Sequence, residues 1–387
     1  MTLLAFAASV VVGTLVAFLF VQSKLLELSL LPYAVLLQVT PIVAVAPLII
    51  ILIKNTAVAL TLCATVRLDA LQSGPLPFRL MGEGIVLFLG PDGEPATLAD
   101  RCCHRTAKLS KGWIDGGNIV CGYHGWTYDR TGALVCIPQF DPETVLPKHR
   151  VPQFHCAARY GYAWVALDEP LQPIPDVPED ADPAYRRIFQ FYDEWQAAPL
   201  RLMENSFDNA HFSFVHKATF GMINAPRPKK YEIEETDYGF QATTVIDILN
   251  PPVAHQVTGS TDELTERRMR NNWYLPFCRR LDMEYPSGIR HIINCATPVD
   301  DGRIQLVQLL YHNDTEADCP AAKLVEWDRA IITEDREMLE STSPDAILDV
   351  GRRVEQHMPS DRPGMIMRRL LELLCEHGGE EVTRAYA

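Results

Sequence analysis

Two short cysteine–histidine pairs constrain this chain more than any other feature. Residues 102–104 read CCH, sixteen residues follow, and residues 121–124 read CGYH, which gives C-x-H…C-x-x-H. Such a set can bind zinc or an iron–sulfur cluster. Zinc fingers usually pair Cys with Cys and His with His along the chain, whereas each loop here offers one of each. The pattern favours a [2Fe–2S] cluster in which each loop gives a thiolate to one iron and an imidazole to the other.

The candidate cluster ligands are Cys102, His104, Cys121 and His124. Composition alone would allow Cys103 in place of Cys102, and the C-x-H spacing selects Cys102. A zinc site, or unrelated core residues, is the alternative interpretation. The ten cysteines are scattered along 387 residues, so we expect reduced thiols and metal ligands rather than a disulfide scaffold.

A second group of candidate ligands lies about 90 residues further on, where residues 204–216 read ENSFDNAHFSFVH. His211 and His216 are five residues apart, and an ideal helix would splay them by about 140°. They could converge on one ion only if the helix ended or bulged between them. Alone, the two histidines would be ordinary core or surface residues. After a cluster-binding domain, they become candidate ligands of a second metal.

Both groups occur in stretches that resemble one family. The sequence RCCHRTAKLSKG…NIVCGYHGWTYDRTGALVCIPQ resembles the Rieske domain of Rieske non-heme iron oxygenases. Pro138 matches the proline segment that covers the cluster. The second loop, CGYHGW, lacks the extra cysteine of respiratory Rieske proteins, which favours the oxygenase type. The pattern N-x-x-D-x-x-H-x4-H, from Asn205 to His216, is similar to the family's mononuclear-iron motif. The resemblance covers residues 63–377 and is to terminal oxygenase subunits of the vanillate/dicamba O-demethylase-like and pheophorbide a oxygenase-like subgroup.

The third iron ligand must come from elsewhere in the chain. Residues 325–341, VEWDRAIITEDREMLES, contain an E-D pair that resembles the subgroup's late-helix motif, which implies Asp335 as the ligand. Asp328, Glu334 and Glu337 remain possible, because charged helix faces are usually only solvated.

Asp208 and Asn205 are the catalytic candidates. Asp208 precedes His211 by three residues, so on a helix both would share one face. The resemblance implies that this aspartate links the iron site of one subunit to a cluster-ligating histidine, here His124, of its neighbour in a trimer. A buried aspartate that only caps local backbone is the alternative. Five further residues could line a substrate cavity or be plain core: Phe207, Phe212, Phe214, Asn272 and Trp273.

The implied fold class is α+β. An all-β Rieske domain at 63–168 is followed at 185–387 by a helix-grip catalytic domain, an antiparallel sheet around a long helix. Patterning predicts strands in the first part, helix within 190–217, and helices at 321–342 and 362–377. Five further strand-like runs lie between 229 and 312: KYEIEE, FQATTVIDIL, RRMRNNWYL, RHIINCA and IQLVQLLYH.

The resemblance implies an oxidoreductase that activates O2 at a mononuclear Fe(II) and hydroxylates or O-demethylates an aromatic or ring-containing small molecule. Electrons come from NAD(P)H through a separate reductase or ferredoxin, and the chain has no Gly-rich dinucleotide motif of its own. Basic residues beside the first loop (Arg105, Lys108 and Lys111) could receive an acidic partner or be a solvated edge. A Rieske electron carrier without oxygenase activity is the alternative. The net charge of −14 argues against nucleic-acid binding.

Residues 1–53 differ from the rest, since Lys24 and Glu27 are their only charged side chains. The stretches 2–22 and 28–53 are each long enough to span a bilayer. We therefore expect residues 1–54 to form an apolar helical segment, and they resemble a fragment of an ABC-transporter permease. The metal domains would then be cytoplasmic and possibly tethered to the inner membrane. A permease component is the competing function, supported by this segment alone.

Overall fold

The computed structural model describes residues 61–237, 239–343 and 355–377. The chain divides into two units, 1–54 and 55–387. The predicted apolar segment, its two candidate spans and the permease-like fragment lie outside the described residues. Within the described part, no helix is both long and apolar enough to cross a membrane.

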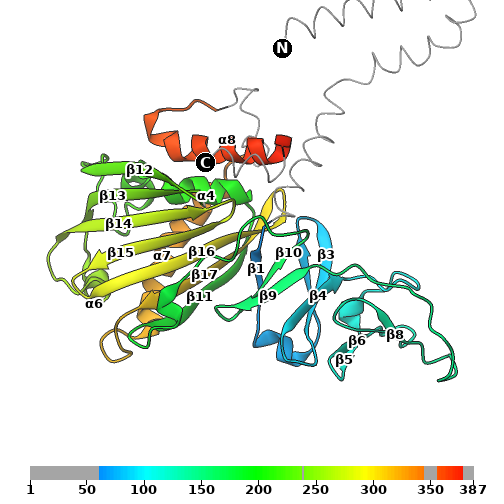
Figure 1. The fold of residues 1–387 in the computed structure, drawn as a ribbon. Coiled ribbons are helices and arrows are strands. Elements are labelled where there is room, and N and C mark those ends of the chain that lie inside the picture. The colour runs from blue at the N-terminus through cyan, green and yellow to red at the C-terminus, as the bar shows by residue number, and fades with distance from the viewer. Residues whose placement is uncertain (1–60, 238, 344–354, 378–387) are drawn as a thin grey trace, which may run out of the picture. The chain divides into compact units, whose positions relative to one another are not determined.

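The first described part is built almost entirely from short antiparallel strands, as the sequence predicted (Figure 1). Glycine-containing turns break the chain before any strand exceeds seven residues, so several small sheets form in place of one large one. The three sheets have the orders β1-β10-β9, β2-β3-β4 and β5-β6-β7-β8. Their strands are β1 (Cys63–Arg67), β2 (Leu76–Leu80), β3 (Glu83–Leu89), β4 (Pro95–Ala99), β5 (Trp113–Asp115), β6 (Asn118–Val120), β7 (Thr127–Tyr128), β8 (Leu134–Cys136), β9 (His155–Arg159) and β10 (Tyr162–Ala166).

The second part is a seven-stranded antiparallel sheet in the order β11-β17-β16-β15-β14-β13-β12. All five predicted strand runs are confirmed. A strand at 278–285 was not expected, because its alternating charged residues hide the apolar ones that face inward. The strands are β11 (Arg186–Trp195), β12 (Lys230–Thr236), β13 (Gly239–Leu249), β14 (Leu264–Tyr274), β15 (Cys278–Tyr285), β16 (Gly288–Asp300) and β17 (Arg303–His312).

Helices cover this sheet, and the longest, α7 (Ala321–Leu339), lies across one face of it (Figure 1). This helix and α8 (Arg362–His377) confirm the two predicted late helices. The helix expected within 190–217 is shorter than that range. Residues 190–195 belong to β11, because pairing with β17 buries one side of this aromatic-rich run. Helix α4 (Pro199–Phe207) begins only after it.

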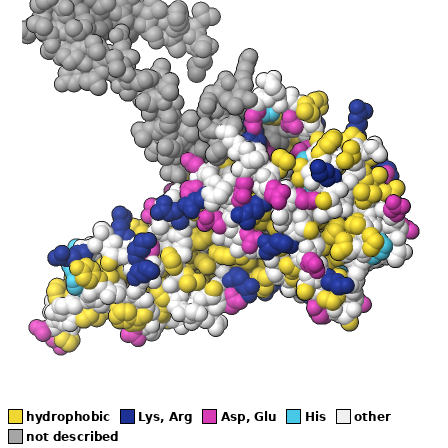
Figure 2. Space-filling model, turned by 180° about the vertical axis from the view of Figure 1, so that it is seen from behind, with side chains coloured by type: hydrophobic (Ala, Val, Ile, Leu, Met, Phe, Trp, Pro, Cys, Tyr) yellow, Lys and Arg dark blue, Asp and Glu magenta, His cyan; other side chains and the backbone are white. Residues whose placement is uncertain are grey.

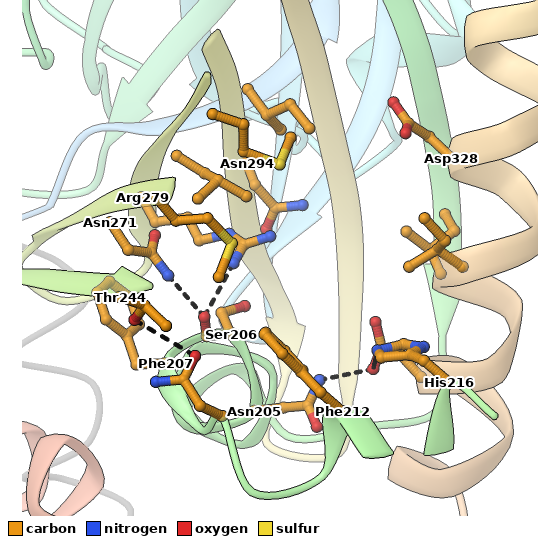
Figure 3. A pocket seen from close by; sticks show the side chains of 18 of the residues that line it. Asn205, Ser206, Phe207, Phe212, His216, Thr244, Asn271, Arg279, Asn294 and Asp328 are labelled. Carbon is orange, nitrogen blue, oxygen red and sulfur yellow. Dashed lines mark hydrogen bonds and ion pairs between the residues drawn. The ribbon is translucent and has the colours of Figure 1, made fainter. Parts of the chain in front are cut away.

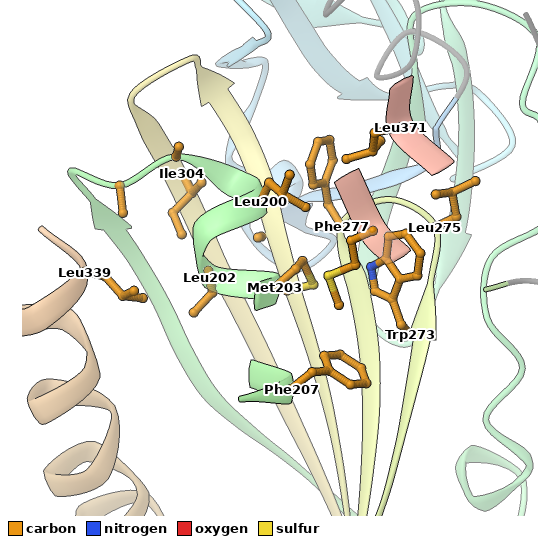
Figure 4. Close-up of a cluster of buried hydrophobic side chains, with 14 of the residues drawn as sticks. Leu200, Leu202, Met203, Phe207, Trp273, Leu275, Phe277, Ile304, Leu339 and Leu371 are labelled. Atoms are coloured by element: carbon orange, nitrogen blue, oxygen red, sulfur yellow. The ribbon is translucent and has the colours of Figure 1, made fainter. Parts of the chain in front are cut away.

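An apolar cluster joins α4 to the sheet and to α8 (Figure 4). Met203 and Phe207 of α4 are buried against Trp273 of β14, and Leu371 of α8 packs on the same group. A buried ion pair supports this packing, since Arg368 of α8 donates to both carboxylate oxygens of Glu204 on α4. Helix α4 is therefore held from both sides.

Strand β11 carries a bulge at Gln190. Phe189 pairs with Leu309 and Phe191 with Gln308, so Gln190 is an extra residue between them. Its side chain accepts a hydrogen bond from Gln308 (2.8 Å) and donates one to Asp328 of α7 (2.6 Å). The bulge thus places a polar side chain between the sheet and α7.

Asp328 also pairs with a fully buried arginine. The Nη2 atom of Arg290, on β16, lies 2.6 Å from Asp328 Oδ2, and both side chains are at most 6% exposed. Burial disfavours the charged guanidinium, but the charge of Asp328 outweighs it and raises the pKa of Arg290. This ion pair connects α7 to the sheet.

Replacing Asp328 by alanine should destabilise the fold, because Arg290 would remain buried without a counter-charge. We expect the apparent Tm of Asp328→Ala to fall by roughly 6–20 °C in a thermal unfolding experiment. Asp193→Ala is the matched control, since Asp193 pairs with the half-exposed Arg329 of the same helix. That variant should lose less than about 4 °C. Equal losses in the two variants would contradict the role of the buried pair.

Candidate metal centres and active-site cavity

The two loops that carry the first Cys–His pairs have the same backbone geometry. The N–H of Cys102 donates to the carbonyl five residues later (2.8 Å), and the N–H four residues later donates to the carbonyl of Cys102 (3.0 Å). Cys121 makes the same two bonds, at 2.9 Å each. The loops are therefore matched turns, each presenting one thiol and one imidazole.

Side-chain burial divides the four candidate ligands into two kinds. Cys102 and Cys121 are buried at 1% exposure each, whereas His104 is exposed and His124 is half-buried. The two imidazole rings lie 4.6 Å apart, centroid to centroid. A buried thiol pair beside an outward imidazole pair fits the donor set of a Rieske cluster, one iron held by thiolates and the other by histidines. Cys103 is exposed, which supports Cys102 as the thiolate.

Neighbouring side chains hold the two loops. His104 stacks on Trp126 at 4.5 Å, and Gln139 donates a hydrogen bond to the carbonyl of His124 (2.8 Å). Pro138 packs so closely on Gly125 that a Cβ there would lie 2.9 Å from its ring, and Gly125 has a φ of +74°. Glycine is favoured at this position for both reasons. Pro138, which the resemblance matched to the covering proline segment, thus packs against the second loop.

The second candidate group forms where a helix ends. Helix α4 stops at Phe207, and the short α5 (Phe212–Val215) begins just after His211 and ends just before His216. The two Nε2 atoms are 3.2 Å apart. The break between α4 and α5, and the short length of α5, allow two histidines five residues apart to converge.

A carboxylate from α7 completes this group. Asp335 Oδ1 lies 3.5 Å from His211 Nε2 and 3.3 Å from His216 Nε2, and the three ligand atoms lie within 4.8 Å of one another. Two imidazoles and one carboxylate form the donor set of non-heme iron(II) oxygenases. Of the other candidates, Asp328 is paired with Arg290 and Glu337 is exposed.

Glu334 has a different role beside the same cluster. It accepts a hydrogen bond from Nδ1 of His216 (2.9 Å) and another from Thr219 (2.8 Å), which leaves Nε2 of His216 as the ligating atom. Burial lowers the pKa of His216, but Asp335 and Glu334 outweigh this effect, so its pKa lies above the usual value. Asn205 donates to Asp335 Oδ1 (2.9 Å) and thereby fixes the carboxylate.

Asp208 lies beside His211, although not through a shared helix as the spacing suggested. It follows the last residue of α4 in an extended conformation, and its Oδ1 accepts the N–H of Ala210 (2.7 Å). Its Oδ2 is 3.4 Å from Nδ1 of His211. That Nδ1 atom is buried and has no hydrogen-bond partner among the described residues. Among the described residues, Asp208 is therefore the carboxylate that faces Nδ1 of His211.

The cluster of His211, His216 and Asp335 lines a cavity of about 960 Å³, including its open mouth. Phe207 and Phe212 line this cavity as predicted (Figure 3). The other three predicted lining residues do not. Phe214 is 58% exposed, and Trp273 lies in the apolar cluster behind the cavity. Strand alternation turns Asn271, rather than Asn272, toward the cavity.

Comparison with known proteins agrees with this arrangement. The model of the Rieske [2Fe-2S] domain matches residues 60–155, and that of the vanillate O-demethylase oxygenase C-terminal domain matches residues 195–377. The methylxanthine N1-demethylase NdmA of Pseudomonas putida is 29% identical over 310 residues, covering 78% of this chain and 83% of NdmA. The vanillate O-demethylase oxygenase subunit of a Pseudomonas species is 30% identical over 228 residues, covering 54% and 53%.

Solved structures share the fold. NdmA with caffeine, from Pseudomonas putida CBB5, superimposes with a TM-score of 0.74 at 25% identity, covering 86% of this chain and 96% of that one. Dicamba monooxygenase bound to dicamba gives 0.71 at 22% identity, covering 83% and 98%. The matched domains imply a [2Fe–2S] cluster, a mononuclear iron, O2 as co-substrate and electrons from a separate reductase or ferredoxin. The α+β fold and both domain matches show that the chain is an oxidoreductase and belongs to the Rieske non-heme iron oxygenases, as a terminal oxygenase component.

Proposed function

We propose that this chain hydroxylates or demethylates an aromatic small molecule in the cavity, at an iron bound by His211, His216 and Asp335. The convergence of these three side chains on the wall of the cavity carries the proposal. The relatives named above demethylate methylxanthines or vanillate. A screen of aromatic methyl ethers for substrate-dependent oxygen consumption, with a surrogate reductase, tests it. No stimulation by any such compound would count against it.

The surrounding residues prepare the site for this reaction. An iron(II) ion held by His211, His216 and Asp335 would supply the chemistry that activates dioxygen. Glu334 keeps the proton of His216 on Nδ1, and Asn205 fixes the orientation of Asp335. Phe207 and Phe212 provide apolar surface for a ring. The chain thus orients its ligands through hydrogen bonds and holds the substrate largely by apolar contact.

Electrons would enter through a cluster held by Cys102, His104, Cys121 and His124. The exposed imidazole edge is the part of this site nearest to solvent. Three exposed basic residues flank the first loop, and basic side chains lie among hydrophobic ones on the molecular face in Figure 2. An acidic reductase or ferredoxin would be attracted to such an edge. The basic residues concerned are Arg105, Lys108 and Lys111.

Glu334→Gln should weaken iron binding at the mononuclear site without affecting the cluster. We expect the affinity for iron to fall by about 10- to 100-fold, because an amide orients His216 less well than a carboxylate does. Glu337→Gln is the matched control, since Glu337 is exposed on the same helix. Metal analysis and chelator competition provide the measurement.

The unmodified chain should contain about three irons and two acid-labile sulfides. Only two irons would favour the electron-carrier alternative.

We also propose that the chain forms a homotrimer in which Asp208 connects His211 to His124 of the neighbouring subunit. Asp208 is one-third exposed and its Oδ2 lies 3.4 Å from Nδ1 of His211, so it remains accessible to a second group. Exposed aromatic side chains beside the cluster loops, Trp113 and Tyr123, offer apolar surface for a subunit contact. Mass determination in solution tests the trimer, and a monomer would exclude it.

Asp208→Asn should keep the fold and both metals yet slow electron transfer by about 10- to 100-fold, because the amide cannot accept a proton from a histidine as a carboxylate does. The measurement is single-turnover transfer from the pre-reduced cluster to iron, with substrate and oxygen present. Asp262→Asn, in an exposed loop, is the control. Transfer at the unmodified rate would leave Asp208 with only its structural bond to Ala210.

We further propose that residues 1–53 associate the enzyme with the inner membrane, with the metal domains on the cytoplasmic side. Only two charged side chains interrupt this apolar stretch. The full chain should float with lipid vesicles in a density gradient, whereas a chain beginning near residue 58 should not. Equal flotation of both would contradict membrane association through this segment.

A further inference from the structure

The cavity is cationic although the whole chain carries a net charge of −14. Three arginines and two aspartates line it. Asp328 is paired with Arg290, and Asp335 belongs to the cluster with the two histidines. Two arginines, Arg267 and Arg279, are left without an acidic partner within the described part of the chain.

Arg279 reaches the cavity because of its position in β15. Alternate residues of this strand face inward, and Arg279 lies between Trp273 on β14 and Asn294 on β16. Figure 3 shows Arg279 beside Asn271 and Asn294 on one wall, away from the wall that carries His216 and Asp328. The guanidinium therefore lies on the opposite wall of the cavity from Asp328.

No described carboxylate forms an ion pair with Arg279. Its Nη1 donates to the carbonyl of Ser206 (3.0 Å), and this is its single hydrogen bond among the described residues. Its Nε atom is buried without a partner. Burial lowers the pKa of Arg279 to about 10, an effect that Asp335 opposes without forming an ion pair. A buried cation without a counter-charge is costly unless a ligand provides one.

Arg267 is less available to a ligand. Its guanidinium lies 4.1 Å from the ring centroid of Phe220 and 5.8 Å from that of Tyr285, so two aromatic faces already contact it. It is only 5% exposed. None of the described aromatic rings lies against the guanidinium of Arg279, which keeps partial exposure in the cavity wall.

A structural role for Arg279 explains only part of this arrangement. Its bond to Ser206 satisfies a carbonyl in the last turn of α4, where cations are favoured. Asn271 already donates to the same carbonyl, at 2.6 Å. A guanidinium has five N–H donors, and this contact uses one of them. Capping therefore does not account for a charged side chain at this position.

We propose that the substrate carries an anionic group on its ring, a carboxylate that pairs with Arg279 while the rest of the ring extends toward His211 and His216. The planar guanidinium matches a carboxylate in shape as well as in charge. The unpaired Oδ1 atoms of Asn271 and Asn294 lie on the same wall and can accept hydrogen bonds from a hydroxyl or amino group on the ring. This assignment rests on the proposed oxygenase function and specifies its substrate class.

Equilibrium binding to the full-length, iron-loaded enzyme tests this proposal without turnover. Calorimetric titrations in the absence of oxygen would compare 3-methoxybenzoate with its neutral isostere 3-methoxybenzamide. We expect the acid to bind at least about 10-fold more tightly. Equal or tighter binding of the amide would overturn the assignment, and this comparison needs no variant. 3-Methoxybenzenesulfonate provides a third arm. Tighter binding of the sulfonate than of the carboxylate would also overturn the choice of a carboxylate.

Substitutions then test whether Arg279 causes the tighter binding of the acid. Arg279→Gln should reduce acid binding by about 10- to 100-fold and leave amide binding nearly unchanged. Arg279→Lys should restore part of the acid preference, since it keeps the charge without the planar geometry. Arg270→Gln removes the same charge from the exposed face of β14 and should leave the preference intact. An acid preference that survives in Arg279→Gln would exclude Arg279 as its source.

Failure of this proposal can be distinguished from failure of the proposed function. Acids that bind through Arg279 but are never oxidised with reductase and oxygen would refute the function and support the pairing. Demethylation of the neutral amide with no acid preference would support the function and refute the pairing.

Discussion

Two consecutive carboxylates on α7 hold the catalytic half of this molecule together. Asp335 contacts both histidines of the α4–α5 segment and accepts a hydrogen bond from Asn205, while Glu334 holds the second histidine from its other nitrogen. Adjacent positions on a helix point about 100° apart, so one residue can reach the ligand cluster while the next reaches around it. The position of α7 on the sheet therefore determines whether the cluster exists, and that position depends on the buried pair of Asp328 with Arg290.

Local sequence was enough to predict the cluster-binding loops, because each loop carries its own candidate ligands within four residues. The matched turns around Cys102 and Cys121 are formed by hydrogen bonds within each loop, and more distant residues only pack over them. The second site was harder to predict. His211 and His216 were identifiable as candidates, but the choice of Asp335 among four acidic residues depends on how α7 packs, and spacing alone does not determine that.

The remaining differences arise from strand geometry. Strand β15 was missed because its charged residues alternate with the apolar ones, and Arg279 within it was not considered as a cavity residue. The prediction of Asn272 as a lining residue was wrong by one position, since a shift of one residue along a strand reverses the face. No sequence pattern marks a single arginine as a binding residue. The role of Arg279 can be inferred only when the structure shows which residues surround it and that none of the described carboxylates pairs with it.

The bulge at Gln190 has a consequence for how this cavity can change in related chains. Ile188 belongs to the buried cluster on the inner face, and beyond the bulge Phe191 and Trp195 are the buried residues. The extra residue thus shifts the inward positions of β11 from even to odd numbers. Deleting Gln190 would leave Ile188 and Phe191 facing inward and would remove the link from Gln308 to Asp328 in one step. The polar side chain on this wall therefore depends on one extra residue in β11. Homologous chains can gain or lose it by a one-codon insertion or deletion, without any substitution in the rest of the strand.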